Sequence, residues 1–583
     1  MKRSWALAAL AVLSIGAPPP LPTSVVILAF SSKEANEVTA VENNLETIGI
    51  PFETTRDVER IAQAPVVILA GTITNTVLSP AQREKLYRFV EAGGTLVATH
   101  VQGNQYFPLF GIAEFAIKST NFGLRFVDSS QDSSLRYLNR PEEREIHFGD
   151  PKGPHELGWT TEYGLSSGTA LARFQNGSPA LIRNYYGRGA AYCLGVSFAD
   201  ATLRWELGQS SDSEERWVNL FAPSADVFRL ILRGLYEASV HPFVLIHTIP
   251  DGRESALILS HDVDARESFK NSVVFATLEQ KYRTASTFFV TTKYFTDSTD
   301  TDYYVSGNIA PLRQLLAMGF DIGSHSVSHL ATFFQFPLGD PAVTFKSYQP
   351  RSAPTVFGEV KVSKELLDRD ISGQHTISFR AGGLSHPRRL IGALEDSGYQ
   401  IDSTRAAGAT LTNFPYRPLR EVQLGAERSG MIEIPVTLDD SRGYLTPATL
   451  DRVSASWAGI VAANSENNAV TCLLIHPTDT TYKLEAEDRL LRYCRARPIW
   501  IGDVTRFGLF AKARAAVRVT SNRVGGELIL RLNRERAALP SGLTLAVEAE
   551  PSVSRVSVQD SQSSDVPYQA IDHGDRKFLV LRP

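Results

Sequence analysis

The feature that most constrains the fold is a repeated alternation of short apolar runs with helical patterns in the first part of the chain. Residues 25–30 and 66–70 are apolar runs of strand length, and helical spacing of apolar residues follows the first of them. A helical pattern over residues 80–92 ends at two glycines, and residues 95–98 form the next strand. Strands that alternate with helices predict a parallel sheet covered by helices. We therefore expect an α/β domain over residues 24–240.

This first region has a general resemblance to a known fold. It resembles the flavodoxin-like, class I amidotransferase-like domains found as accessory modules in secreted carbohydrate enzymes. A working glutaminase needs a cysteine nucleophile at a strand-to-helix elbow, and none of Cys193, Cys472 and Cys494 lies in such a sequence. His100 follows the third strand near the place of that site, and we interpret this lone histidine as structural. We predict a non-catalytic module for binding or scaffolding.

Length, charge and cysteine content limit the classes of function. A chain of 583 residues is too long for one hydrophobic core, and we expect roughly three or four domains. The net charge of −4 argues against nucleic acid or an anionic membrane surface as the main partner. The three cysteines allow at most one disulfide and form no Cys-x-x-Cys motif, so we predict buried core thiols.

The N-terminus has the pattern of a secretory signal. Lys2 and Arg3 precede an apolar run over residues 5–15, and small residues and prolines follow it. This order is typical of export signals, and the run is too short to span a bilayer. We expect residues 1–20 to be a signal peptide. The mature protein is then expected to be periplasmic or extracellular, without a transmembrane anchor.

A second α/β region, predicted over residues 250–510, has two acidic residues at the end of an apolar strand. Residues 256–260 form this strand, which runs directly into the sequence His-Asp-Val-Asp. Residues two apart on a strand point to the same side, so Asp262 and Asp264 can enter one pocket at its carboxyl end. Two close carboxylates repel each other in a dry pocket, and a metal bound to one of them relieves that repulsion. A solvated turn with two acids is the alternative interpretation.

Two histidines further along the chain strengthen the case for a metal. A short strand over residues 321–323 leads to a His-x-x-x-His segment at positions 325–329. His325 and His329 lie on one face if this segment forms a helical turn. Neutral imidazoles at that spacing are good zinc ligands. With Asp264 they would make a site with three protein ligands and open positions for water and substrate.

The combination of these motifs resembles the polysaccharide deacetylases of the NodB-homology type, the fold of carbohydrate esterase family four. Asp262 and Asp264 match the first motif of that family, and residues 325–329 match the second. Weaker matches to the third, fourth and fifth motifs follow in order at residues 379–383, 399–403 and 473–477. The match covers under half of the chain. The resemblance implies a central deformed (β/α) barrel.

Two departures from the family pattern concern the substrate. A valine separates the two aspartates, which are usually adjacent, and the arginine motif has Ala381, Gly382 and Gly383 in place of a proline and an aromatic residue. The order of modules most resembles the deacetylase portion of the Pel exopolysaccharide hydrolase/deacetylases, although this sequence contains no N-terminal glycosidase barrel. The identity of the sugar therefore does not carry over from the family.

The resemblance also implies roles for individual residues. The metal, Zn²⁺ or another divalent ion such as Co²⁺, would be bound by Asp264, His325 and His329. Asp262 would be the catalytic base, and Arg380 would keep it ionised through a charge-assisted hydrogen bond. His476 would protonate the leaving amine, and a backbone N–H near Gly382 or Gly383 would help to stabilise the oxyanion. A structural ion pair for Arg380 and a core or capping role for His476 are the alternative interpretations.

The last segment, residues 511–583, has a different pattern. It alternates between apolar and polar residues at period two over 517–520 and 527–532, with glycine-containing turn sequences between the runs. This pattern predicts a small antiparallel β domain.

Taken together, these patterns predict a metal-dependent hydrolase that removes N-acetyl (or O-acetyl) groups from an extracellular or cell-wall polysaccharide. The expected partner is this acetylated polysaccharide, with no nucleic acid. One alternative is an amidohydrolase with the same fold that acts on small cyclic imides or amides; the signal peptide counts against it. Another is a catalytically silent polysaccharide-binding module; the complete Asp-x-Asp and His-x-x-x-His set counts against it.

Overall fold

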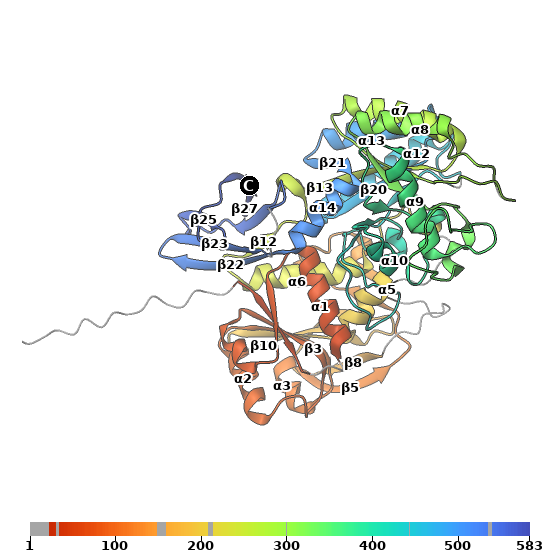
Figure 1. Cartoon of the computed structure of the whole chain (residues 1–583). Coiled ribbons are helices and arrows are strands. Elements are labelled where there is room, and N and C mark those ends of the chain that lie inside the picture. Colours follow the sequence, from red (N-terminus) through yellow and green to blue (C-terminus); the bar gives the residue numbers. More distant parts are fainter. Residues whose placement is uncertain are drawn as a thin grey trace, which may run out of the picture.

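The chain folds into three parts, each built around its own β-sheets (Figure 1). The computed structural model describes residues 23–30, 34–148, 159–207, 214–298, 300–441, 443–534 and 539–582. The predicted signal peptide lies outside these residues. Within these ranges, no helix combines the length and the apolar character that crossing a membrane requires.

The first part contains a sheet with the strand order β2-β1-β3-β4-β11-β10-β9-β6-β7. The strands from β2 to β11 in this order are parallel, and those beyond β11 are antiparallel. Their bounds are β1 Val25–Ala29, β2 Phe52–Thr55, β3 Val66–Ile73, β4 Thr95–Val101, β6 Gly123–Phe126, β7 Glu145–His147, β9 Thr169–Phe174, β10 Pro179–Tyr186 and β11 Gly189–Leu194. The parallel half confirms the predicted flavodoxin-like sheet, and the antiparallel half extends it.

Helices cover both faces of the parallel half. Alternate residues of β1 enter two different cores, with Val25 and Ile27 in one and Val26 and Leu28 in the other. This burial on both faces explains why the strand is a continuous apolar run. The helices of this part are α1 Ala35–Ile48, α2 Pro80–Glu91, α3 Phe107–Phe110, α4 Pro141–Arg144, α5 Arg204–Leu207 and α6 Ser224–Ser239. A separate two-stranded ladder pairs β5 (Ile112–Lys118) with β8 (Thr160–Leu165).

The central part is a parallel sheet that curls into a half-barrel. Its order is β18-β17-β16-β15-β14-β13-β20-β19, and β21 also pairs with β13. The bounds are β13 Ser255–Val263, β14 Thr287–Val290, β15 Asp321–Ser324, β16 Ser378–Phe379, β17 Ile401–Asp402, β18 Ile432–Glu433, β19 Leu438–Asp439, β20 Val470–Ile475 and β21 Ile499–Asp503. Every pairing in it is parallel. The predicted deformed (β/α) barrel is confirmed in this incomplete form.

Helices surround the half-barrel. Figure 1 shows α7, α8, α12 and α13 together at the edge away from the first part. The helices of the central part are α7 Arg266–Lys281, α8 Ser306–Ala317, α9 Val356–Asp370, α10 Leu390–Asp396, α11 Ala407–Thr410, α12 Leu450–Asn467, α13 Tyr482–Arg495 and α14 Val504–Ala515. Loops connect the carboxyl ends of the strands to these helices, and α/β folds have their sites at this edge of the sheet.

The C-terminal part consists of two small sheets, ordered β22-β23-β25 and β12-β24-β27-β26. Their strands are β12 Val244–Ile246, β22 Val517–Val524, β23 Glu527–Arg534, β24 Thr544–Glu548, β25 Arg555–Gln559, β26 Tyr568–His573 and β27 Arg576–Leu581. The predicted antiparallel domain is confirmed, except that β23 and β25 run parallel. Because β12 precedes the half-barrel yet pairs with β24, we propose the domain bounds 24–240, 250–510 and 511–583 with β12 assigned to the last.

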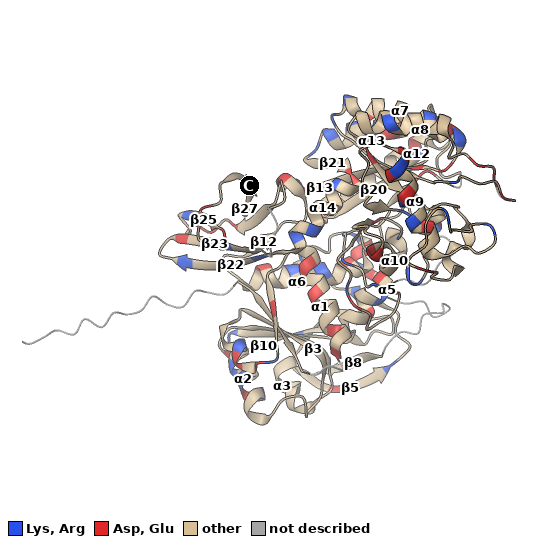
Figure 2. Cartoon of the chain, viewed as in Figure 1, with Lys and Arg blue, Asp and Glu red and all other residues tan. Residues whose placement is uncertain are grey.

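A buried polar network joins the first part to the half-barrel. Arg229 on α6 has no exposed surface and forms ion pairs with Asp226 and Glu206. Asp226 in turn accepts hydrogen bonds from the Thr412 hydroxyl at 2.6 Å and the Asn413 N–H at 2.8 Å. Elsewhere, residues of both charge signs are interspersed over all three parts (Figure 2). The two domains thus meet through paired buried charges.

Candidate active site

Strand β13 brings two aspartates to the carboxyl edge of the half-barrel. It pairs with β14, β20 and β21, which places it in the middle of the sheet. Asp262 is buried near the end of the strand, and Asp264 follows the strand and is partly exposed. Because side chains alternate along a strand, both carboxylates face the same side.

The predicted metal ligands come together at this edge. The ligand atoms of Asp264, His325 and His329 lie within 4.8 Å of one another. Nε2 of His329 is 3.5 Å from Oδ2 of Asp264, and the two imidazole rings are 5.0 Å apart between centroids. Residues from the ends of β13 and β15 therefore form one group.

The two histidines do not lie on a helical turn, which corrects the expectation from their spacing. No helix covers residues 325–330; instead Ser326 and His329 have φ values of 66° and 55°. The carboxylate of Glu359 on α9 accepts hydrogen bonds from the N–H groups of Val327 at 2.9 Å and Ser328 at 2.8 Å. This buried acid holds a loop that brings both imidazoles to the same side. Sequence spacing gave no sign of Glu359.

His325 has the chemistry of a ligand for a zinc-type ion. Its Nδ1 is 2.9 Å from the carbonyl oxygen of Arg380, to which it donates in the neutral tautomer. Its Nε2 is buried and has no hydrogen-bond partner among the described residues. Burial lowers the pKa of His325 to about 4, so the ring is neutral near pH 7. An unpaired lone pair beside a carboxylate and a second imidazole fits a bound divalent metal.

Arg380 holds Asp262 as the family resemblance implies. Its Nη1 donates to Oδ1 of Asp262 at 2.9 Å. Two further hydrogen bonds of 2.9 Å connect the guanidinium to the carbonyl and hydroxyl oxygens of Ser403, and its carbon lies 4.5 Å from the centre of the Phe289 ring. The fully buried guanidinium therefore has one orientation.

The same contact keeps Asp262 ionised. Burial alone would raise the pKa of Asp262, but the charges of His325 and Arg380 outweigh it and lower that pKa below its usual value. Since His325 is neutral near pH 7, the charges that act at that pH are those of Arg380 and His476. Asp262 can then accept a proton through Oδ2, the oxygen that Arg380 leaves open.

His476 directly follows β20, which lies on the side of β13 opposite to β14 and β15. Its Nε2 is 3.7 Å from Oδ2 of Asp264, and its Nδ1 is 2.7 Å from Oδ1 of Asp440. Lys483 forms an ion pair of 2.5 Å with the other oxygen of Asp440. Burial alone would lower the pKa of His476, but Asp440 and Asp264 raise it well above its usual value. The ring is therefore protonated near pH 7, with Nδ1 engaged by Asp440 and Nε2 toward Asp264.

Asp440 is the partner of His476 that sequence patterns did not single out. It is buried, and the charge of His476 helps to lower its pKa to about 2 against the opposing effect of burial. Asp440 follows the two-residue strand β19, and its partner His476 lies far along the chain. Only the parallel pairing of β19 with β20 brings the two together.

Asp440→Asn is expected to shift the alkaline limb of the kcat/KM profile to lower pH. A proton donor loses activity as pH rises through its pKa, and removing the Asp440 charge lowers the pKa of His476. The profile of acetate release against pH measures this shift. The acid limb, which depends on Asp262, is the internal control and should stay in place. An unchanged alkaline limb in a folded variant would show that His476 is not the acid.

The loop that follows Arg380 (the arginine loop, residues 380–385) approaches the predicted metal ligands because it contains glycine. A Cβ on Gly382 would lie 2.6 Å from Cδ2 of His329, so a side chain there would displace the ring. This close packing gives a physical reason for a small residue where the family has a bulkier one. The proposed oxyanion contact from a backbone N–H near Gly382 or Gly383 stays a prediction.

Asp402 is connected to this loop through the hydroxyl of Thr404. Its carboxylate accepts from the Thr404 hydroxyl at 2.6 Å, and that hydroxyl accepts from the Ala381 N–H at 3.1 Å. Burial raises the pKa of Asp402 to about 6, and it neighbours the equally buried Glu433 across the β17–β18 pair. Asp402 is therefore a structural acid in this arrangement.

A second buried acid group lies on the opposite face of β13. Nε2 of His261 is 2.8 Å from Oε1 of Glu279 and 3.9 Å from Oε2 of Glu487. All three side chains are buried among helices α7 and α13. Burial and the neighbouring Glu279 raise the pKa of Glu487 well above its usual value, so a shared proton satisfies the two acids. This group stabilises the strand that carries Asp262.

The first domain has a hollow of about 480 Å³ at the carboxyl ends of its own strands, lined in part by His100 and Trp159. His100 is buried, and its Nδ1 is 2.9 Å from the Thr161 hydroxyl. All three cysteines of the chain are free and buried, which confirms their prediction as core thiols. Cys193 lies within β11 and not at an elbow, in agreement with a non-catalytic module.

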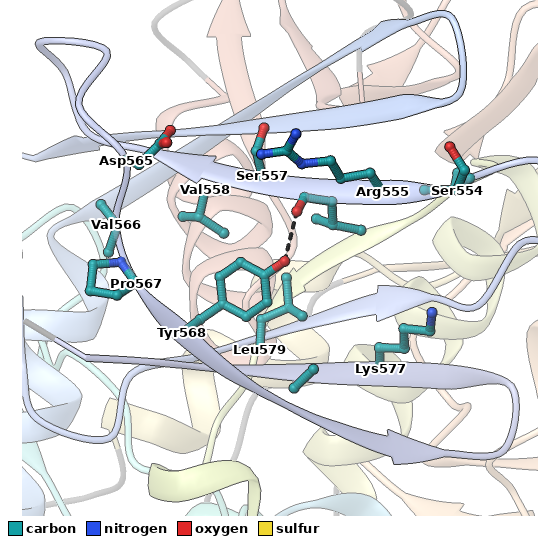
Figure 3. Close-up of a pocket in the computed structure, with 13 residues that line it drawn as sticks. Ser554, Arg555, Ser557, Val558, Asp565, Val566, Pro567, Tyr568, Lys577 and Leu579 are labelled. Carbon is teal, nitrogen blue, oxygen red and sulfur yellow. Dashed lines mark hydrogen bonds between the residues drawn. The ribbon is translucent and has the colours of Figure 1, made fainter.

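A further hollow of about 490 Å³ lies in the C-terminal part, between β25 and β26 (Figure 3). Its lining is largely aliphatic, with Arg555, Asp565 and Lys577 around it. Tyr568 crosses it and donates a hydrogen bond of 2.6 Å to the carbonyl of Val556. The side chains suited to hydrolysis are those of the half-barrel and not those of this hollow.

Comparison with known proteins gives similarities at the level of the fold. No family model and no curated protein matches the sequence. The crystal structure of Agd3, described as a novel carbohydrate deacetylase, aligns over 97% of this chain and 97% of that chain, with 13% identity and a TM-score of 0.40.

Two further solved structures are similar over less than half of this chain. The chitin deacetylase from the fungal pathogen Colletotrichum lindemuthianum covers 45% of this chain and 89% of its own, at 16% identity and a TM-score of 0.30. The family 4 carbohydrate esterase from Streptomyces lividans, in complex with acetate, covers 43% and 93%, at 12% identity and a TM-score of 0.28. The chain is thus similar to carbohydrate deacetylases. These scores are all below 0.5, so the similarity does not by itself assign a function.

Proposed function

We propose that this protein is a metal-dependent hydrolase that removes N-acetyl (or O-acetyl) groups from an acetylated polysaccharide. The supporting observation is that three kinds of group lie close together at the end of β13. They are the group of Asp264, His325 and His329, the buried Asp262 that Arg380 contacts, and the His476 ring that Asp440 contacts. A protein that only binds polysaccharide has no need of an ionised base and a proton donor on opposite sides of a metal site.

The residues suggest how each step is performed. A divalent ion bound by Asp264, His325 and His329 would polarise the acetyl carbonyl and make a water molecule more acidic. Asp262 takes the proton of the attacking water at Oδ2, while Arg380 keeps Oδ1 engaged. His476 donates the proton on Nε2 to the leaving nitrogen, and Asp440 holds its Nδ1 in place. Water supplies the hydroxyl of the released acetate.

The ligand set supports a choice of metal, and the N-terminal sequence supports a place of action. Two imidazoles and one carboxylate favour Zn²⁺, and Co²⁺ takes the same ligands. The basic and apolar pattern at the N-terminus supports export to the periplasm or the outside of the cell. The resemblance to the Pel deacetylases stays a prediction.

The proposal predicts acetate release that depends on a metal. The purified protein should release acetate from oligosaccharides of N-acetylglucosamine or N-acetylgalactosamine, or from peptidoglycan. A chelator should abolish the release, and added Zn²⁺ should restore it. Enzymatic assay of free acetate measures both. No metal-dependent acetate from any of these substrates, with hydrolysis of small cyclic imides instead, would favour the amidohydrolase alternative.

A further inference from the structure

The segment from Glu214 to Asn219, which leads out of the first domain, is fixed to the edge of the half-barrel that carries the site. Asn219 donates through its backbone N–H to the Thr437 carbonyl at 2.7 Å. Its side chain exchanges hydrogen bonds of 3.0 and 2.7 Å with the backbone of Asp439, the neighbour of Asp440. This end of the segment is therefore attached beside the partner of His476.

The other end of the segment is attached to the loop after β17. The buried carboxylate of Glu214 pairs with Arg405 at 2.9 Å and accepts from the Ala406 N–H at 2.8 Å. Between the two ends, Val218 is buried in a small cluster that includes Leu384 from the arginine loop. Hence the backbone of this segment is held in one position.

The middle of the segment reaches the loop that contacts the metal ligands. The carboxylate Oε1 of Glu215 lies 3.5 Å from the place of a Cβ on Gly383, and the preceding Gly382 contacts the ring of His329. A Cβ on Gly408 would be 2.4 Å from the carbonyl oxygen of Trp217, so α11 passes directly against this turn. The short helical turn Glu215–Trp217 thus lies at the rim of the site.

Trp217 presents its ring to solvent at this rim. It is 44% exposed, although its main chain is packed, and the Arg216 guanidinium lies 5.5 Å from its ring centre. A large exposed aromatic ring on a fixed backbone offers apolar area at a low entropic cost of ordering, because it has only two rotatable side-chain bonds. The face of a pyranose ring that carries C–H groups has the size and the polarity to stack on such an indole.

We infer that Trp217 forms a sugar-binding subsite, in which it stacks on a ring of the polysaccharide next to the sugar that is deacetylated. The inference rests on the proposed deacetylase function and deepens it, because a subsite beside the reacting group serves only a polymeric substrate. It also assigns the first domain a part in substrate recognition, since that domain supplies the segment.

The test compares a long and a short substrate in the zinc-loaded, full-length protein. On acetylated pentasaccharides, Trp217→Ala is expected to raise KM about tenfold with kcat nearly unchanged. Trp217→Phe, which keeps an aromatic face, should lie between this variant and the wild type. On 4-nitrophenyl acetate, which is too small to reach Trp217, all three proteins should have the same kcat/KM. Tyr185→Ala, which removes an aromatic ring that is 68% exposed in the first domain and stacks with Arg183, is the matched control and should behave as wild type.

The outcomes separate this inference from the proposed function. If the wild type deacetylates the pentasaccharide and Trp217→Ala has the same KM, the inference is wrong and the proposed function stands. A loss of equal size on both substrates would also overturn it, because it would indicate a disturbed site. If the wild type releases no acetate from any saccharide, the proposed function fails as well. Melting temperatures of the variants should agree with that of the wild type, because the segment is anchored through Glu214 and Asn219.

Discussion

Asp262→Asn is expected to lower kcat for acetate release by roughly 10²- to 10⁴-fold, the usual contribution of a general base, while the protein retains its metal. The amide has nearly the shape of the carboxylate and can still accept the hydrogen bond from Arg380. It cannot take a proton from water. The metal should remain because its ligand atoms come from three other side chains.

Two measurements on the same preparation check this expectation. Metal content by mass spectrometry should equal that of the wild type, and acetate release should be lost. Asp264→Asn is the matched control, since it changes the same chemistry two residues along the strand and should lose metal and activity together. If Asp262→Asn lost the metal while Asp264→Asn kept it, the roles of base and ligand would be exchanged.

His325→Ala and His329→Ala are expected to lose the metal itself. Removing a ligand should weaken binding by more than the roughly 10- to 100-fold that follows the loss of a residue that only supports a ligand. His325 is fully buried, so its substitution also leaves a cavity and an unpaired Arg380 carbonyl. His329 is partly exposed, and His329→Gln therefore tests the site with less risk to folding.

His476→Ala provides the contrast for these variants. This ring lies beside the same metal site, 3.7 Å from Asp264, but belongs to the proton donor. It should lose activity and keep the metal, as measured by titration with a zinc indicator. Retention of metal by His329→Gln, together with its loss in His476→Ala, would overturn the assignment of the ligands.

The sequence was sufficient to predict the parts of the site that lie close together in the chain. The alternation of a strand placed Asp262 and Asp264 on one side, and the structure has them there. The apolar strands of the first and central domains were also predictable, because burial on both faces leaves a continuous apolar run.

The parts that were missed depend on contacts between distant segments. Spacing suggested a helical turn for His325 and His329, but the structure uses a loop held by Glu359, a residue of another helix. Asp440 contacts His476 only because β19 and β20 are adjacent in the sheet. Trp217 reaches the rim only because the first domain packs against the half-barrel. Local patterns carry no information about such partners.

The pairing of β12 with β24 has a consequence for how the chain assembles. β12 is synthesised before the half-barrel, yet its only neighbour in the strand order is made after the half-barrel is complete. Contacts between segments so far apart in sequence form slowly, because a long loop must close first. Until β24 has been synthesised, β12 has no strand to pair with, although the whole of the first domain is already available to fold. We therefore expect the ladder between β12 and β24 to form last during synthesis. The unpaired edge of β12 is then the place where a nascent chain is most exposed to mispairing.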